Sequence, residues 1–339
     1  MKTEIYLRPP FTSMDEVVEQ TDVWDATTAS WVAQCPRLAE GRILYNLRSA
    51  EEAYAATAGK ALHAALALYY TDGDLDACLL ELARVWGHDA DWRLPPTHRW
   101  AHLHLGHLEV VFRNYVAYAA RHDTFKPLPV KREDLQLDQV IAGIWQVTDD
   151  GHVVLGESKF MMEFEIELPD GSTTRITHSG KPDLPIEMGG SIYILDHKTT
   201  SSYLSDWYFA KFKFSNQLRG YCAMLKALTG LPVGGALING VYVGAKASDS
   251  KFTGGKVARY GPMNYQPAHL TEALQNQYFW REQLMHHYAQ GYFPQNAGQA
   301  CTSCDLQSLC AASPSMRETV MRTDYTVSPK NVAETFLTL

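Results

Sequence analysis

The spacing of hydrophobic and polar positions changes near residue 130. Before this point, apolar residues recur every three or four positions, a spacing that places them on one face of a helix. Helices are predicted over 29–48, 50–70, 75–86 and 98–122, with a break in the first at Cys35-Pro36. We therefore expect a helical segment over about 29–125.

After residue 130 the pattern is typical of strands. Apolar and polar residues alternate over 152–168, and Pro169-Asp170-Gly171-Ser172 has the composition of a hairpin turn. The other predicted elements are strands over 173–184, 191–198 and 236–243, helices over 206–228 and 270–290, and a polar loop over 244–262. Such a mixture predicts an α/β fold in which helices flank a small mixed sheet.

The chain shows no internal repeat and no low-complexity linker. One composite domain over 1–339 is therefore expected. Its parts are the helical segment, a core over about 130–245, a helix and cysteine cluster over about 265–312, and a polar tail over 313–339.

The composition bounds the class of protein. A chain of 339 residues that is 46% apolar can bury a sizeable core, and its net charge of −8 counts mildly against nucleic-acid binding. Carboxylates gathered at a metal site would also lower the net charge. No leader peptide and no apolar run of membrane-spanning length is recognised, so a soluble cytoplasmic protein without a membrane partner is expected. In that reducing compartment, grouped cysteines indicate metal or cluster ligation.

The strongest local signal is Asp196-His197-Lys198 at the end of an apolar strand, with Asp183 thirteen residues earlier. Residues i and i+2 of a strand share a face, so Asp196 and Lys198 can act on one attacking water. Phosphodiester cleavage needs acidic metal ligands and a cation that stabilises charge on the phosphorus centre. The alternative is an exposed strand with an ordinary ion pair.

The second signal is Cys301-x2-Cys304-x5-Cys310 in a loop. Three thiolates this close fit a metal ion or a cluster, although three unrelated loop cysteines remain the alternative. The fourth ligand must come from Cys35, Cys78 or Cys222. The last two lie in apolar helical contexts, where a buried free thiol is usual, whereas Cys35 stands at a helix break.

Together these motifs resemble, in the same order, those of RecB-like nucleases of the PD-(D/E)XK superfamily. The series comprises Cys35, Gly59-Lys60-Ala61-Leu62-His63, Gly180-Lys181-Pro182-Asp183, Asp196-His197-Lys198-Thr199, Gln217-Leu218-Arg219-Gly220-Tyr221 and the three C-terminal cysteines. The subgroup with this cysteine arrangement includes CRISPR spacer-acquisition nucleases, AddB-type nucleases and phage relatives. The resemblance runs from about residue 30 to 312 and implies a restriction-endonuclease-like core.

The resemblance also implies roles for individual residues. His63, Asp183, Asp196 and the backbone carbonyl of His197 would hold Mg²⁺ or Mn²⁺. Lys198 would orient the attacking water, and Gln217 and Tyr221 would contact DNA or brace the site. The residues implied as ligands of a 4Fe–4S cluster, which would form a C-terminal clasp, are Cys35, Cys301, Cys304 and Cys310.

Some assignments stay open at this point. An upstream acid is frequent in these enzymes, and either Glu157 or Glu163 fits; the strand position favours Glu157. His98 and His102, four positions apart on the predicted helix, form a weaker candidate zinc pair. Judged alone, a histidine in an alanine-rich helix, such as His63, is more often a residue of the core or the surface than a ligand, and only its place in the motif series favours a ligand.

The expected function is metal-dependent hydrolysis of DNA, exonucleolytic and on single strands or ends. Six aromatic residues surround Lys211 and Lys213 over 203–214, a composition suited to stacking on unpaired bases, although half or more of the rings must belong to the core. No phosphate-binding loop is found, so any unwinding would need a helicase or recombination partner. The alternatives are a non-catalytic DNA-binding or assembly subunit and a zinc-ribbon interaction protein.

Overall fold

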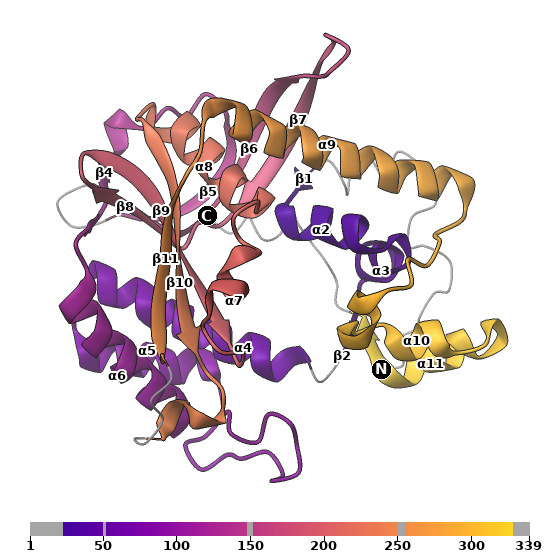
Figure 1. Ribbon diagram of the computed structural model, residues 1–339, viewed down its shortest axis with the longest axis horizontal. Helices are drawn as coiled ribbons and strands as arrows, with labels where there is room; N and C mark the ends of the chain where they lie inside the picture. Colours follow the sequence, from indigo (N-terminus) through magenta and orange to yellow (C-terminus); the bar gives the residue numbers. More distant parts are fainter. Residues whose placement is uncertain (1–22, 50–51, 148–151, 250–254, 328–339) are drawn as a thin grey trace. The chain divides into compact units, whose positions relative to one another are not determined.

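The computed structural model describes residues 23–49, 52–147, 152–249 and 255–327 (Figure 1). The N-terminal segment in which no leader was recognised lies outside these residues. The chain divides into two compact units: unit 1 comprises Met1–Ala53, Met161–Ser179 and Glu272–Leu339, and unit 2 comprises Tyr54–Phe160 and Gly180–Thr271. Strand β6 (His152–Glu167) runs through both units. The single composite domain stays a prediction.

Unit 2 is built on a five-stranded sheet with the order β11-β10-β9-β8-β3. Its strands are β3 (Lys126–Pro127), β8 (Leu184–Met188), β9 (Ser191–Thr200), β10 (Val233–Tyr242) and β11 (Val257–Asn264). Strands β9 and β10 are parallel and the other pairs are antiparallel, so the sheet is mixed. The β8–β9 hairpin turns at Gly189-Gly190, and both residues have positive φ, which glycine adopts without strain.

Helices cover both faces of this sheet. They are α4 (Glu52–Thr71), α5 (Leu75–Trp86), α6 (Leu105–His122), α7 (Asp206–Ala210) and α8 (Asn216–Thr229). Successive side chains of a strand point to opposite faces. His197 on β9 contacts rings of α4 and α6, whereas Lys198 bonds to Gln217 on α8. The prediction of a mixed sheet flanked by helices is therefore confirmed.

Unit 1 combines short elements from both ends of the chain. Its helices are α2 (Ala26–Gln34), α3 (Pro36–Ala39), a π-helical turn Glu40–Leu44, α10 (Gln307–Ala311), α11 (Arg317–Asp324) and most of α9 (Pro267–Gln290). Strand β1 (Val23–Trp24) pairs in parallel with β7 (Thr173–Gly180), and β2 (Leu47–Ser49) pairs with β12 (Tyr325–Val327). A small core joins them, formed by Leu38, Leu47, Leu306, Leu309, Met321 and Tyr325.

Several elements differ from the sequence prediction. The predicted helix 206–228 is divided, because the chain turns after α7 and the side chain of Ser215 caps a new helix at the backbone N–H of Leu218. The predicted loop 244–262 contains the start of β11, and the predicted tail 313–339 contains α11 and β12. Further short elements are β4 (Pro129–Lys131), β5 (Val140–Val147) and 3₁₀ turns at Arg132–Asp134, Ala245–Ser248, Gln299–Ser303 and Pro314–Met316. Within the described residues, no helix has the length and apolar character to cross a membrane.

The histidines near α6 do not form the predicted helical pair. His98 and His102 precede the helix, which begins at Leu105, so their side chains are not one turn apart on a helix face. His104 caps the helix by accepting from the backbone N–H of His107. The ring of His107 is buried and its Nε2 lies 3.0 Å from the carbonyl oxygen of Val243. These roles are structural and explain the cluster without zinc.

The buried ring of His107 predicts a loss of stability in acid. Burial lowers the pKa of His107 to about 4, against an ordinary value of 6.5 in the unfolded chain. The stability that the neutral ring contributes is complete above pH 6.5 and is lost as the pH falls toward 4. Urea denaturation should show this loss, about 3 kcal/mol, in the wild type and a smaller loss in His107→Gln. Equal pH dependence in the two proteins would contradict this account.

Candidate active site

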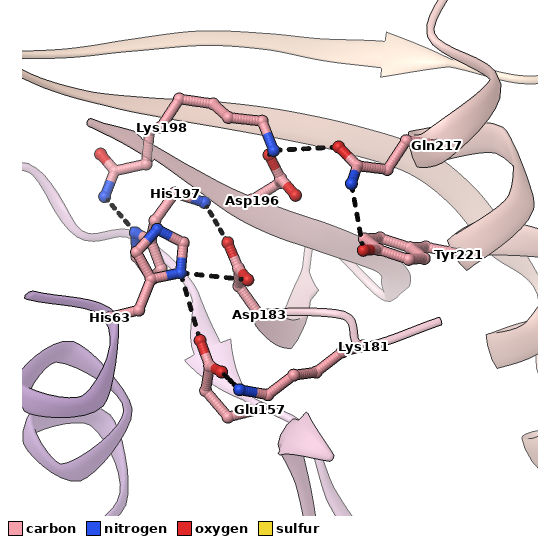
Figure 2. A network of polar contacts seen from close by, with 10 residues as sticks. His63, Glu157, Lys181, Asp183, Asp196, His197, Lys198, Gln217 and Tyr221 are labelled. Atoms are coloured by element: carbon pink, nitrogen blue, oxygen red, sulfur yellow. Dashed lines mark hydrogen bonds and ion pairs between the residues drawn. The ribbon is translucent and has the colours of Figure 1, made fainter. Parts of the chain in front are cut away.

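Three side chains from separate elements of unit 2 meet at one point (Figure 2). His63 projects from the middle of α4, Glu157 lies in β6, and Asp183 immediately precedes β8. The Nδ1 atom of His63 is 3.3 Å from Oε1 of Glu157 and 3.3 Å from Oδ1 of Asp183. All three ligand atoms lie within 4.8 Å of one another, the only such group of three among the described residues. One imidazole and two carboxylates can therefore share one cation.

The backbone at Glu157 is held in an unusual conformation. Its φ of 55° lies in the left-handed region, which costs a non-glycine residue about 1–2 kcal/mol. Its N–H is 3.0 Å from the carbonyl oxygens of both Pro182 and Asp183, so the break between β7 and β8 fixes this residue. Lys181 forms an ion pair with the Glu157 carboxylate. In this conformation the carboxylate of Glu157 contacts His63.

A second group of polar side chains lies along β9 and α8. Lys198 Nζ is 2.7 Å from Oδ2 of Asp196 and donates to Oε1 of Gln217 at 3.0 Å. The amide of Gln217 in turn donates to the hydroxyl of Tyr221 at 3.2 Å. Oδ2 of Asp183 accepts from the backbone N–H of His197 at 2.6 Å, which ties the metal-compatible group to β9 (Figure 2).

Burial and mutual charge set the protonation states of these groups. Burial lowers the pKa of His63, but Asp183 and Glu157 outweigh burial and raise it to about 10. Burial raises the pKa of Asp183, yet His63 holds that pKa below its ordinary value. Burial also raises the pKa of Asp196, against the opposing effect of Lys198 and with the help of Asp183. The proton on His63 and the ammonium group of Lys198 thus balance the negative charge of these carboxylates. A bound divalent cation would balance the same negative charge.

The ring of His197 faces the opposite side of the sheet from Lys198. It stacks on Tyr70 with ring centroids 6.1 Å apart, and its Nδ1 lies 2.8 Å from Nδ2 of Asn239. Asn239 also donates to the hydroxyl of Tyr115 at 2.6 Å. Burial lowers the pKa of His197 to about 3, so the ring is a neutral part of the core. The predicted role of its backbone carbonyl stays a prediction.

The group formed by His63, Glu157 and Asp183 opens into a cavity of about 930 Å³. His63, Glu157 and Asp183 line it together with Lys181 and Tyr221. The remaining wall consists largely of small residues of α4, including Ala56, Gly59, Ala64 and Ala67, and of Glu81 and Arg84 from α5. The carboxylates therefore border a cavity whose wall on α4 consists mostly of small side chains.

Four cysteines line a separate, small cavity in unit 1. Cys35 occupies the junction of α2 and α3, and Cys301, Cys304 and Cys310 come from the C-terminal loop and α10. All four border a cavity of about 80 Å³, and the backbone N–H of Asn296 donates to the sulfur of Cys35 at 3.4 Å. Cys78 and Cys222 lie elsewhere, fully buried in unit 2.

The structure thus brings most of the predicted site residues into two groups. The candidate upstream acids separate clearly: Glu157 joins His63, whereas Glu163 forms an exposed ion pair with Arg175. Asp196 contacts Lys198 and lies outside the group of three ligand atoms. Sequence reasoning assigned no role to Lys181 or Asn239. Lys181 stands inside the Gly-Lys-Pro-Asp motif, which was a usable signal, whereas no local pattern marked Asn239.

Comparison with known proteins adds an independent finding. The sequence model of the PD-(D/E)XK nuclease superfamily matches residues 24–311. No curated protein matches the chain. A solved structure described as "Crystal structure of SSO0001" matches with 12% sequence identity and a TM-score of 0.31, over 88% of this chain and 91% of that one.

The polar contacts behind β9 predict a stability effect at Asn239. Replacing Asn239 with Leu leaves Nδ1 of His197 without its buried partner and removes one hydrogen bond of the Tyr115 hydroxyl, which keeps its contact with the hydroxyl of Tyr70. This change should destabilise the protein by about 1–3 kcal/mol. Urea denaturation measures the change. A double-mutant cycle with Tyr115→Phe should be non-additive, because both variants remove the same hydrogen bond. Additive effects would indicate that Asn239 contributes only by packing.

Proposed function

Because the chain belongs to the PD-(D/E)XK nuclease superfamily, whose members are metal-dependent phosphodiester hydrolases, we propose that it is a Mg²⁺- or Mn²⁺-dependent deoxyribonuclease. Its substrates are single-stranded DNA or DNA ends, which it degrades as an exonuclease in repair, recombination or phage DNA processing. The observation that carries this proposal is the convergence of His63, Glu157 and Asp183 beside the Asp196–Lys198 pair. A helicase or recombination partner would supply any unwinding.

The residues present fit a divalent cation. Carboxylate oxygens with one imidazole nitrogen suit Mg²⁺ and Mn²⁺, and their ligand atoms are already close enough to share an ion. His63, Glu157 and Asp183 would hold it, with Asp196 and the carbonyl of His197 as further ligands. The bound cation would polarise the scissile phosphate and lower the pKa of the attacking water.

The chain's own residues supply the remaining chemistry. Burial lowers the pKa of Lys198, but Asp196 and Asp183 outweigh burial and raise it, so the side chain is an ammonium group. Lys198 therefore orients the water by hydrogen bonding and stabilises negative charge that develops on the phosphate. Gln217 accepts from Lys198 and so fixes its direction, while Tyr221 supports Gln217.

The first prediction for this proposal concerns catalysis. The wild type should cleave end-labelled DNA in Mg²⁺ or Mn²⁺ and lose cleavage in a chelator. Asp196→Ala and Lys198→Ala should each reduce the rate by at least about 10²-fold, since one loses a carboxylate at the cation and the other a charge-stabilising ammonium. The gel assay should be accompanied by circular dichroism to show that both variants fold.

Glu163→Ala is the matched control, because this carboxylate forms an exposed ion pair in unit 1. Its activity should equal that of the wild type. Full activity in Asp196→Ala or Lys198→Ala would refute the catalytic assignment, and chelator-resistant cleavage would refute metal dependence.

Within the superfamily, we place the chain in the RecB-like branch with a 4Fe–4S cluster held by the four cysteines. The support is that all four cysteines line one cavity. Cys35 reaches this cavity from the other end of the chain, since Asn296, whose backbone N–H donates to its sulfur, is 261 residues later. The motif order along the chain is consistent with that branch.

The spacing of the sulfurs favours a cluster over a single zinc ion. Tetrahedral zinc, with Zn–S bonds of about 2.3 Å, would place its sulfurs about 3.8 Å apart. Among the described residues, no three cysteine sulfurs lie within 4.8 Å of one another. In this proposal the four thiolates would therefore hold a 4Fe–4S cluster and not a single zinc ion.

The second prediction concerns the role of this cluster. Cys35→Ala should lose the brown colour and bound iron, and its melting temperature should fall strongly. The cluster would link Cys35 to the three C-terminal cysteines and so close most of the chain into a loop. Closing so long a loop would contribute on the order of 5 kcal/mol to the free energy of unfolding, by analogy with a disulfide. Cys78→Ala and Cys222→Ala are the controls and should keep iron. A brown, stable Cys35→Ala protein, or stoichiometric zinc in the wild type, would contradict the cluster.

A further inference from the structure

The residues between β9 and α8 carry an unusual group of exposed rings. We call residues 201–215 the aromatic segment; six of its fifteen residues are aromatic. Tyr208 and Phe209 are buried, whereas Tyr203, Trp207 and Phe214 are 60%, 86% and 71% exposed. No ring of another described residue stacks on Trp207 or Phe214. Exposing a tryptophan to this degree leaves its apolar face in water without benefit to folding.

The segment lies at the proposed catalytic site because both of its ends do. It begins after Lys198 and ends before Gln217, and these two side chains are hydrogen-bonded to each other. Within it, Tyr208 is hydrogen-bonded to Thr200, and the charge of Lys198 contributes to lowering the pKa of Lys211, after burial. The segment that carries the exposed rings therefore connects two residues of the proposed catalytic site.

The fold holds the aromatic segment against the sheet. A Cβ atom on Gly240 of β10 would lie 2.7 Å from Leu204 and 2.9 Å from Phe209, so glycine permits this close approach. Phe209 also stacks on Tyr260 of β11 with ring centroids 5.3 Å apart. Anchored by its buried rings, the segment presents the exposed ones on a supported surface.

The charge beside the rings indicates a polyanion. Lys211 lies over Tyr208 and Phe212, with Nζ 4.2 and 4.9 Å from the ring centroids, and Lys213 is exposed. Neither lysine forms an ion pair with a described residue. The centre of a protein interface is usually depleted of lysine, whereas grooves for single-stranded nucleic acid combine lysine with flat rings. Rings gain stacking energy only from bases with a free face, which bases inside a duplex lack.

We propose that the aromatic segment is a stacking platform that holds unpaired bases of a single-stranded nucleic acid beside the carboxylate site, with Trp207 and Phe214 as the stacking rings. Lys211 and Lys213 contact the phosphates. This inference rests on the proposed nuclease function for its biological substrate, but the binding that it describes does not require hydrolysis.

The test measures binding by the full chain without divalent cation, so that no metal-dependent cleavage occurs. The probe is a fluorescent oligothymidylate of about 15 nucleotides, compared with an abasic strand of equal length and a blunt duplex. Trp207→Ala and Phe214→Ala should each weaken oligothymidylate binding by at least about fivefold, and Trp207→Phe should restore most of it. Binding of the abasic strand and of the duplex should not change.

Two controls separate stacking from other effects. Phe279→Ala removes a half-exposed ring of α9 and should bind as the wild type does. Lys211→Ala and Lys213→Ala should reduce the dependence of binding on salt, whereas Trp207→Ala should leave that dependence unchanged.

Specific results would overturn the platform. These are no measurable binding of oligothymidylate by the wild type, equal binding by Trp207→Ala, or an equal loss for the abasic strand. A wild-type dimer that becomes monomeric in Trp207→Ala, with unchanged binding, would assign the rings to a second copy. Trp207-dependent binding by a protein that cleaves no DNA would support the platform and refute the nuclease. Cleavage that depends on Asp196, together with binding that does not depend on Trp207, would support the nuclease and refute the platform.

Discussion

The carboxylate of Asp183 is the point on which the candidate site depends. One of its oxygens accepts from the backbone of β9, and the other faces His63 on α4. The backbone carbonyl of Asp183 accepts from the N–H of Glu157 and helps to hold that residue in its strained conformation. A helix and the two strands β9 and β6 are thus positioned relative to one another by a single buried residue. Its burial strengthens these contacts, because water does not screen them.

The sequence alone was sufficient to predict which side chains share a face where residue chemistry and strand periodicity act together. Asp196 and Lys198 follow an apolar run, so their common face could be inferred from the alternation of side chains along a strand. The cysteines were recognisable because thiols rarely occur at such spacing for other reasons. The turn at Gly189-Gly190 indicated that the chain after Asp183 runs beside the strand of Asp196, but the role of Asp183 as a ligand was implied by the order of motifs along the chain.

Other features depend on contacts that a local pattern does not contain. The left-handed backbone of Glu157 arises from carbonyls about 25 residues later in the chain. The break between α7 and α8 occurs in a stretch whose apolar spacing continues through it. Strand β12 forms only because β2, near the other end of the chain, offers a pairing edge. In each case a distant partner overrides the preference of the local segment.

The division of the chain into units also has a consequence for its synthesis. Unit 2 is contained within residues 54–271, apart from the stretch 161–179, whereas unit 1 requires residues from both ends. As the chain leaves the ribosome, unit 2 becomes complete first, because domains fold as their last residues emerge. A nascent chain that ends between residues 271 and 301 would contain every residue of the carboxylate site and only one of the four cysteines that share a cavity.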